Sequence, residues 1–290
     1  MESTTGWARV ARIVRRFGRF VLANVLQMPL PPKARRRKTD KVDTARLLRE
    51  YLNGQLPRSF TPARLLREVR RLTSSRESLV SRRTALQNWV NRYLAHETWD
   101  SRQGLWSRRG LDRFRAFAEG LGGPDHVTLS VKLDELESVE GLISRVESEM
   151  LAVYRDWPAA QWVDAIDGIA PIGAVSILAR IGPIERFDNP EQLIAFAGLA
   201  PGLQQSDSTR RDGRIGGGGT DKHLRHYLIE ASVWARRIPR YAATYARVEA
   251  RRGKKIARLV VARMILRSIY KMLRDGVEFD AAAAAEAAAA

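Results

Sequence analysis

The feature that most constrains the fold is a pair of long stretches in which apolar residues recur at the spacing of packed helices. An apolar period of about 3.5 residues places side chains along one seam of a helix. The first stretch runs from Thr61 to about Glu97, and the second runs from Leu129 to Trp157. We therefore predict two amphipathic helices that form an antiparallel coiled-coil hairpin over residues 61–160, joined by a Trp-, Arg- and Gly-rich segment. The seam residues are Leu65, Val69, Leu72, Leu79, Leu86, Val90 and Tyr93, then Leu129, Leu133, Leu136, Val139, Ile143, Val146, Met150, Tyr154 and Trp157.

Two seam positions of the first helix carry arginine instead of an apolar residue, Arg76 and Arg83. A charge on a seam weakens an isolated dimer, but a carboxylate on the facing helix can match it. We therefore expect these arginines to meet acidic residues of the second helix. Such an arm commonly joins or pairs subunits, and a plain helical bundle fits the same pattern.

The charge of the chain indicates what it binds. Its 290 residues include 50 Lys and Arg against 32 Asp and Glu, a formal net charge of +18. This excess is larger than solubility requires and favours nucleic acid as a partner.

The composition also bounds the kind of protein. A hydrophobic content of 44% suffices for one or two cores. The sequence has no run of about 18 apolar residues for a bilayer span, and it has no cysteine for disulfides or thiolate zinc sites. We expect a cytoplasmic, nucleoid-associated prokaryotic protein in which carboxylates bind any metal.

The first 60 residues combine apolar runs with basic and acidic clusters. The sequence predicts a helix over residues 7–17 and a strand at FVLANV, residues 20–25. Asp40 and Asp43 then begin a helix, and an i, i+3 pair lies on one helix face. The two carboxylates can hold a hard divalent cation against a phosphate, or they can be an N-cap and a first-turn dipole partner. The basic residues before them are candidates for backbone binding: Arg35, Arg36, Arg37 and Lys38.

The segment GIAPIG, residues 168–173, is expected to form a tight turn between helices. Gly168 and Gly173 frame this turn, and an apolar helix follows from Ala174 to Ile181. The arrangement is similar to the helix-hairpin-helix element, in which backbone N–H groups at a helix N-terminus hold a phosphate without reading bases. A simple corner between two helices matches the same pattern, and both interpretations stay open.

A flexible, cationic loop is predicted from Gln204 to Gly219. Ser206 lies in it, and four glycines end it, so the backbone can approach a phosphodiester while arginines neutralise the charge. A serine hydroxyl becomes a nucleophile only when a base or a metal removes its proton. Ser206 is therefore either a nucleophile or an ordinary serine of a surface loop. The arginines of the loop are Arg210, Arg211 and Arg214.

The C-terminal part is helical and strongly basic. From Trp234 to Arg274 the sequence has thirteen Lys and Arg residues and one acidic residue, Glu249. We expect a surface that binds nucleic-acid backbone with an affinity that falls steeply with salt. His223 and His226 have no evident third metal ligand and are expected to face phosphate or the edge of the core. The alanine-rich tail, residues 279–290, is excluded from the fold. Candidate backbone-binding residues in this part are Lys222, Arg225, Lys254 and Lys255.

Three segments in order resemble one known family: KTDKVDTARLL at residues 38–48, GIAPIG, and AGLAPGLQQS at residues 197–206. Together they resemble the DEDD insertion-sequence transposases related to the Piv invertase, a family of RNA-bridged recombinases, over about residues 2–237. The resemblance implies a mostly helical protein with a partial RuvC-like (RNase H-like) α/β domain at 1–60, the hairpin at 61–160, and a helical transposase domain at 161–278. It also implies that Ser206 attacks the scissile phosphate. Asp40 and Asp43 match the last two acidic ligands of Mg²⁺, and Glu2, in MESTTGW, matches the acidic residue of the family segment E-x-T-G-G-Y/W.

The resemblance therefore implies a DNA transposase or site-specific recombinase. Its partners would be DNA, a structured guide RNA and other copies of the chain in a dimer or tetramer. The first acidic residue of the family lies on a strand that precedes the position of Glu2, whereas this sequence begins at Met1. We expect an N-terminally truncated relative, which either receives the missing strands from another chain or is a catalytically inactive DNA- or RNA-binding protein. A DNA-bridging protein that acts through the hairpin is a third hypothesis.

Overall fold

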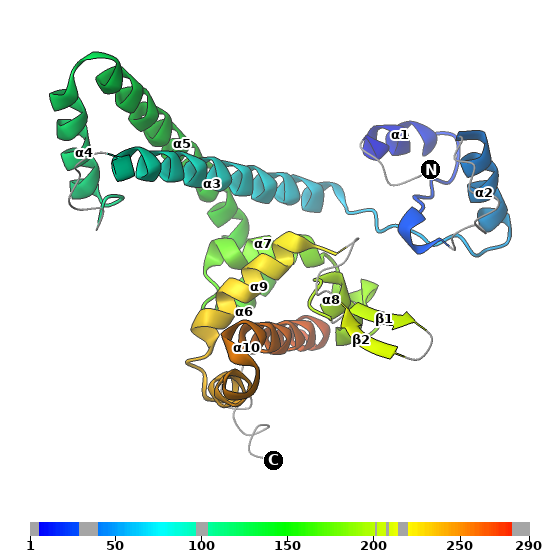
Figure 1. Ribbon diagram of the computed structural model, residues 1–290. Coiled ribbons are helices and arrows are strands. Elements are labelled where there is room, and N and C mark those ends of the chain that lie inside the picture. The colour runs from blue at the N-terminus through cyan, green and yellow to red at the C-terminus, as the bar shows by residue number, and fades with distance from the viewer. Residues whose placement is uncertain are drawn as a thin grey trace. The chain divides into compact units, whose positions relative to one another are not determined.

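The structure is a computed structural model that describes residues 6–28, 40–96, 104–200, 202–206, 209–213 and 220–279. The described residues are mostly helical, with one two-stranded sheet (Figure 1). The chain forms two compact units, residues 1–63 and residues 64–290. Among the described residues, no helix combines the length and apolar character needed to cross a bilayer.

The described part of the first unit contains two α-helices, α1 (Trp7–Val14) and α2 (Asp40–Leu52). The strand predicted at residues 20–25 is wrong: this segment makes one isolated bridge, Ala23 to Arg58, before a 3-10 turn at Val25–Gln27. Asn24 N–H donates to Pro57 O at 2.8 Å. Pro57 has no N–H to donate in return, which limits a ladder at this point. Both helices of this unit carry exposed apolar side chains, among them Ile13 of α1 (49% exposed) and Leu52 of α2 (73%).

The second unit begins with the arm, which consists of α3 (Arg64–His96), α4 (Arg108–Leu121) and α5 (Gly123–Arg155). The prediction of two long helices is confirmed, and α3 and α5 lie side by side (Figure 1). They run antiparallel, because Arg76 pairs with Glu147 at 2.6 Å while Arg83 pairs with Glu140 at 3.6 Å. The two seam arginines therefore meet carboxylates of the facing helix, as expected. Close to the connection between the long helices, α4 packs Phe114 into an apolar cluster with residues of α3 and α5.

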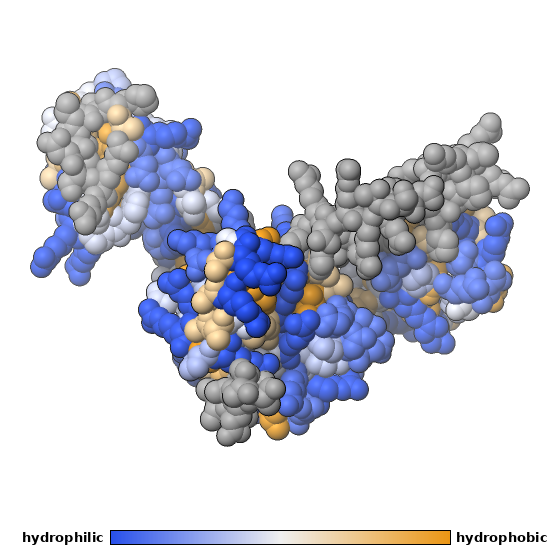
Figure 2. All heavy atoms as spheres, turned by 60° about the horizontal axis from the view of Figure 1, so that its bottom comes forward, coloured by the Kyte–Doolittle hydropathy of each residue, from blue (hydrophilic) through white to orange (hydrophobic). Residues whose placement is uncertain are grey.

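The rest of the second unit is called here the body. Its helices are α6 (Pro158–Asp164), α7 (Pro171–Ile181), α8 (Pro190–Phe196), α9 (Lys222–Ala235) and α10 (Pro239–Asp275), and all of them except α9 begin at proline. Proline suits the first helical position because its missing N–H would have no intrahelical acceptor there. The apolar faces of α7, α9 and α10 enclose one continuous core. Helix α10 is interrupted at Gly253, where φ is 79°. On the face that Figure 2 brings forward, hydrophobic residues are scattered among hydrophilic ones.

Candidate functional site

Ser206 lies at the end of a two-stranded antiparallel ribbon that projects beside α8 (Figure 1). The ribbon consists of β1 (Gly202–Ser206) and β2 (Thr209–Gly213). Gly202 pairs with Gly213 and Ser206 pairs with Thr209, so residues 207 and 208 connect the strands. The predicted flexible loop is therefore wrong for residues 204–206 and 209–213, because strand pairing fixes their backbone. Ser206 adjoins the tip of this ribbon.

The two segments that enter and leave the ribbon meet at Gly198. Asp221 N–H donates to Phe196 O at 2.8 Å, which joins the segments across the ribbon's base. Gly198 has φ +66°, and a Cβ at this position would lie 2.8 Å from both Cβ and Oγ1 of Thr220. Only glycine allows this approach without strain. The first glycine of AGLAPG, Gly198, is therefore explained by the structure: it allows the close approach that closes the base of the ribbon.

Arginines of two helices hold the entering segment by its backbone carbonyls. Arg263 of α10 donates from Nε to Leu199 O at 2.7 Å, and Arg225 of α9 donates from Nη1 to Gly198 O at 3.4 Å. Burial lowers the pKa of Arg263, and hydrogen bonds from a charged donor to a carbonyl are stronger than neutral ones. The base of the ribbon is therefore fixed to the helical body from two sides.

The leaving segment ends in the N-cap of α9. Asp221 accepts hydrogen bonds at Oδ1 from the N–H groups of His223 (3.1 Å) and Leu224 (2.9 Å). An aspartate here satisfies orphan donors and its charge suits the positive end of the helix dipole. Its other oxygen lies 3.6 Å from Nη1 of Arg180. The cap of α9 is thereby tied to α7.

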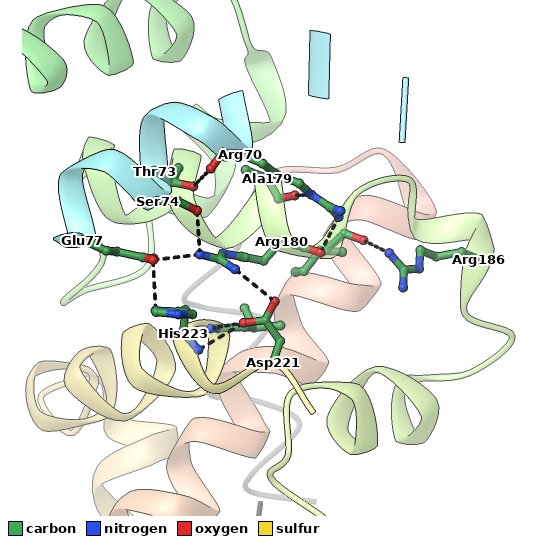
Figure 3. Close-up of polar contacts among 11 residues, drawn as sticks. Arg70, Thr73, Ser74, Glu77, Ala179, Arg180, Arg186, Asp221 and His223 are labelled. Atoms are coloured by element: carbon green, nitrogen blue, oxygen red, sulfur yellow. Dashed lines mark hydrogen bonds and ion pairs between the residues drawn. The ribbon is translucent and has the colours of Figure 1, made fainter. Parts of the chain in front are cut away.

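Arg180 is the centre of a network of four residues, called here the Glu77 network: Glu77, Arg180, Asp221 and His223 (Figure 3). Glu77 of α3 accepts from Arg180 Nη2 at 2.8 Å and lies 3.0 Å from Nδ1 of His223, both through Oε2. The side chains of Glu77 and Arg180 are only 15% and 16% exposed. Oε1 of Glu77 and Nε of Arg180 are buried and have no hydrogen-bond partner in the described part of the chain. The network joins the arm, α7 and the base of the ribbon.

Two further arginines lie at the C-terminal end of α7 (Figure 3). Arg70 donates to Ala179 O at 2.6 Å and to Arg180 O at 3.0 Å, and Arg186 donates to Ile181 O at 3.2 Å. Cations at this end complement the helix dipole. Burial, and next the charge of Arg180, lower the pKa of Arg70. Burial, followed by the charge of Arg70, lowers the pKa of Arg186 to about 10. With a pKa of about 10, Arg186 stays charged at neutral pH.

The GIAPIG segment differs in part from its prediction. Gly168 lies in the connection between α6 and α7 at φ +92°, as a tight turn requires. Gly173 does not frame the turn, because α7 already begins at Pro171 and Gly173 belongs to its first turn. Ala170 is the N-cap and provides no side-chain hydrogen bond. Whether this turn holds a phosphate stays a prediction.

The remaining predicted residues fall into three groups. Lys222, Lys254 and Lys255 are exposed, the last two beside the interruption of α10 at Gly253. Asp40 and Asp43 lie in the first turn of α2, in the first unit, so their relation to Ser206 stays a prediction. Within the described ranges, no group of three or more His, Asp and Glu residues is arranged to hold a metal ion. Glu2, Arg35, Arg36, Arg37, Lys38 and Arg214 lie outside the described residues, as do the side chains of Asp40, Ser206, Arg210 and Arg211.

Sequence reasoning missed the residues that hold the ribbon. Asp221 had a readable signal, since an aspartate directly before an apolar helical run is a typical N-cap. His223 was expected at a phosphate or at the core edge, and it pairs with Glu77. Arg70, Arg180 and Arg263 had no local signal, because their partners lie 41 to 110 residues away along the chain.

Comparison with known proteins places these features in one family. A family model described as the transposase IS116/IS110/IS902 family matches residues 160–247. The chain is 30% identical over 286 residues to a putative transposase of Sinorhizobium fredii, covering 88% of this chain and 71% of that protein. It is 30% identical over 165 residues to a probable family 20 transposase of Pseudomonas aeruginosa, covering 54% and 47%. It is 32% identical over 142 residues to the transposase for insertion sequence element IS1111A of Coxiella burnetii, covering 46% and 37%.

Proposed function

Because this chain belongs to the IS116/IS110/IS902 family of transposases, we propose that it cuts and rejoins DNA strands with Ser206 as the nucleophile. In the proposed step the serine oxygen bonds to phosphorus, one phosphorus–oxygen bond of the DNA breaks, and the serine proton passes to a base. One phosphodiester replaces another, so the strand can be rejoined without an external energy source. The observation that carries this proposal is the anchored ribbon, which holds Ser206 next to its tip.

Rigid support is what such a nucleophile needs. A reacting group held in near-attack geometry gains rate because the ordering has already been achieved in the folded protein. The ribbon base is joined by a backbone hydrogen bond and by Arg263. The arginines of the ribbon, Arg210 and Arg211, are proposed to neutralise the phosphate while Ser206 attacks.

We further propose the DEDD, RNA-bridged type of mechanism, with a RuvC-like acidic site. Asp40 and Asp43 begin α2 three residues apart, and with Glu2 they would hold Mg²⁺. When bound, the ion supplies neutralisation of charge at the reacting phosphate. A structured guide RNA and further copies of the chain are the proposed partners besides DNA. The exposed apolar side chains of α1 and α2 support association with another chain.

The test is a covalent protein–DNA adduct. Purified protein is incubated with element-end DNA, RNA transcribed from the element and Mg²⁺, and the adduct is detected by denaturing gel and mass spectrometry. We expect an adduct that Ser206→Ala reduces to background while Ser208→Ala, which changes a neighbouring serine, retains it. An adduct that persists in Ser206→Ala would refute the proposed nucleophile. Binding in a parallel gel shift with no adduct from any variant would favour the alternative, an inactive DNA- or RNA-binding relative.

A further inference from the structure

A cleft of about 370 Å³ opens on the body, away from the ribbon's own residues. It lies where the connection between α6 and α7 passes the C-terminal end of α9. Ligand pockets in proteins commonly have volumes of about 300 to 1,000 Å³, so this cleft is large enough for a small planar group. The lining residues are Asp167, Gly168, Ile169, Ala170, Trp234 and Arg237.

Trp234 makes this cleft chemically distinctive. Its side chain is 51% exposed, whereas tryptophan is highly buried on average. The guanidinium of Arg237 lies 4.8 Å from the centre of the indole ring. No carboxylate pairs with Arg237 among the residues that the structure describes. The cleft thus offers a half-exposed aromatic ring and, over it, a guanidinium that no carboxylate of the described residues neutralises.

The position of Trp234 is fixed by a close backbone approach. Gly168 has φ +92°, and a Cβ there would lie 2.6 Å from Cβ of Trp234 and 2.7 Å from Ala231 O. A side chain at residue 168 would therefore push α9 away from the connection. At residue 168 the nearest atoms are the Cβ of Trp234 and the backbone of Ala231. The Trp234 side chain is about half exposed, so part of its ring is open to a ligand.

From these contacts we propose that the cleft binds an unstacked nucleobase of a single-stranded nucleic acid, with the adjoining phosphate beside Arg237. This inference rests on the proposal that the chain handles nucleic acid. Bases of single strands stack on aromatic rings and on guanidinium planes, whereas bases in a duplex keep their faces covered by their neighbours. Asp167 adds an acceptor for an exocyclic amino group, as carboxylates accept from cytosine N4. The segment that begins at the cleft, from Trp234 to Arg274, has thirteen Lys and Arg residues and one acidic residue, which favours a polyanion over an apolar peptide.

The test compares single strands with a duplex. The full chain is titrated with a fluorescein-labelled, mixed-sequence DNA strand of about 12 nucleotides, the same strand annealed to its complement, and the RNA of the same sequence. We expect Trp234→Ala to weaken single-strand binding by about 5- to 150-fold, which corresponds to the loss of one stacked base. Duplex binding should stay within about twofold, and Trp234→Phe should keep most of the single-strand affinity. The tighter of the DNA and RNA strands identifies the source of the base.

Two controls keep the result interpretable. Arg237→Gln and Lys271→Gln each remove one exposed charge from the body, and only the first should weaken single-strand binding more than duplex binding. The chain has seven tryptophans, so quenching of indole fluorescence by the strand should decrease in Trp234→Phe. Thermal unfolding should show that all variants fold. Single-strand binding unchanged in Trp234→Ala, equal loss on both forms of DNA, or equal effects of the two charge variants would overturn the proposal. None of these readouts uses the Ser206 adduct, so failure of one proposal is distinguishable from failure of the other.

Discussion

Charged side chains act differently along the arm and at its junction with the body. Along the arm, arginines of α3 pair singly with glutamates of α5, and the most exposed of these arginines is Arg82, which meets Glu135 with its side chain 60% exposed. At the junction, Arg180 meets Glu77 and Asp221 together, and its side chain is 16% exposed. Exposed pairs contribute about 0 to 1 kcal/mol, whereas breaking a buried pair leaves a charge without compensation. The arm pairs therefore fit the register of two helices, while the junction pairs hold separate parts of the fold together.

The largest expected effect is from Arg180→Met. The substitution keeps much of the apolar stem but leaves the carboxylates of Glu77 and Asp221 without their shared cation. We expect a loss of about 3 kcal/mol in the free energy of unfolding, measured by urea denaturation. Arg82→Met is the matched variant in the arm and should cost less than about 1 kcal/mol. Equal losses from the two variants would remove the distinction between arm and junction.

Gly198→Ala should have the next largest effect. A methyl group there meets Thr220 at 2.8 Å, in a backbone conformation that alanine rarely adopts. We expect a loss of about 2 kcal/mol in the free energy of unfolding, because both strain and overpacking oppose the change. Because the ribbon base would move, the yield of the Ser206–DNA adduct should decrease by more than the loss of folded protein accounts for.

The control for this change lies on the arm. Gly141 is within α5, and a Cβ at this position would meet nothing within 4 Å. Alanine there should raise the free energy of unfolding by up to about 1 kcal/mol and leave the adduct unchanged. Loss of the adduct in Gly141→Ala would mean that the arm shapes the site as directly as the ribbon base does.

The same contrast explains what the sequence could predict. The arm was predictable because its pattern is local: Leu129, Leu133 and Leu136 recur at helical spacing and are all buried. The sequence predicts a loop where the ribbon lies because its glycines and polar residues have low strand propensity, and its pairing depends on a base closed by Gly198 and Asp221. At FVLANV the opposite holds: the residues have high strand propensity, but no neighbouring segment continues the pairing. Only the single bridge between Ala23 and Arg58 forms there. The Ser206 segment was identified by resemblance, and its supports came only from the tertiary structure.

The smallest expected effect concerns the core of the body, where a polar group is buried, in contrast to the apolar clusters of the arm. Tyr241 is fully buried, and its hydroxyl lies 2.9 Å from Oγ of Ser268. Burial raises the pKa of Tyr241 above its usual value of 10.0. The neutral phenol is therefore favoured in the folded state, so the contribution of Tyr241 to the free energy of unfolding is complete below pH 10 and is lost as pH rises through the folded pKa.

Tyr241→Phe should cost about 1 kcal/mol in the free energy of unfolding at pH 8 through the lost hydrogen bond. Above pH 10 the wild type should lose up to about 1.4 kcal/mol per pH unit from this group, so the two unfolding free energies should converge. The difference between the two proteins, measured by urea denaturation from pH 8 to pH 11, cancels the titration of all other groups. A difference that stays constant across this range would contradict the assigned role of the buried hydroxyl.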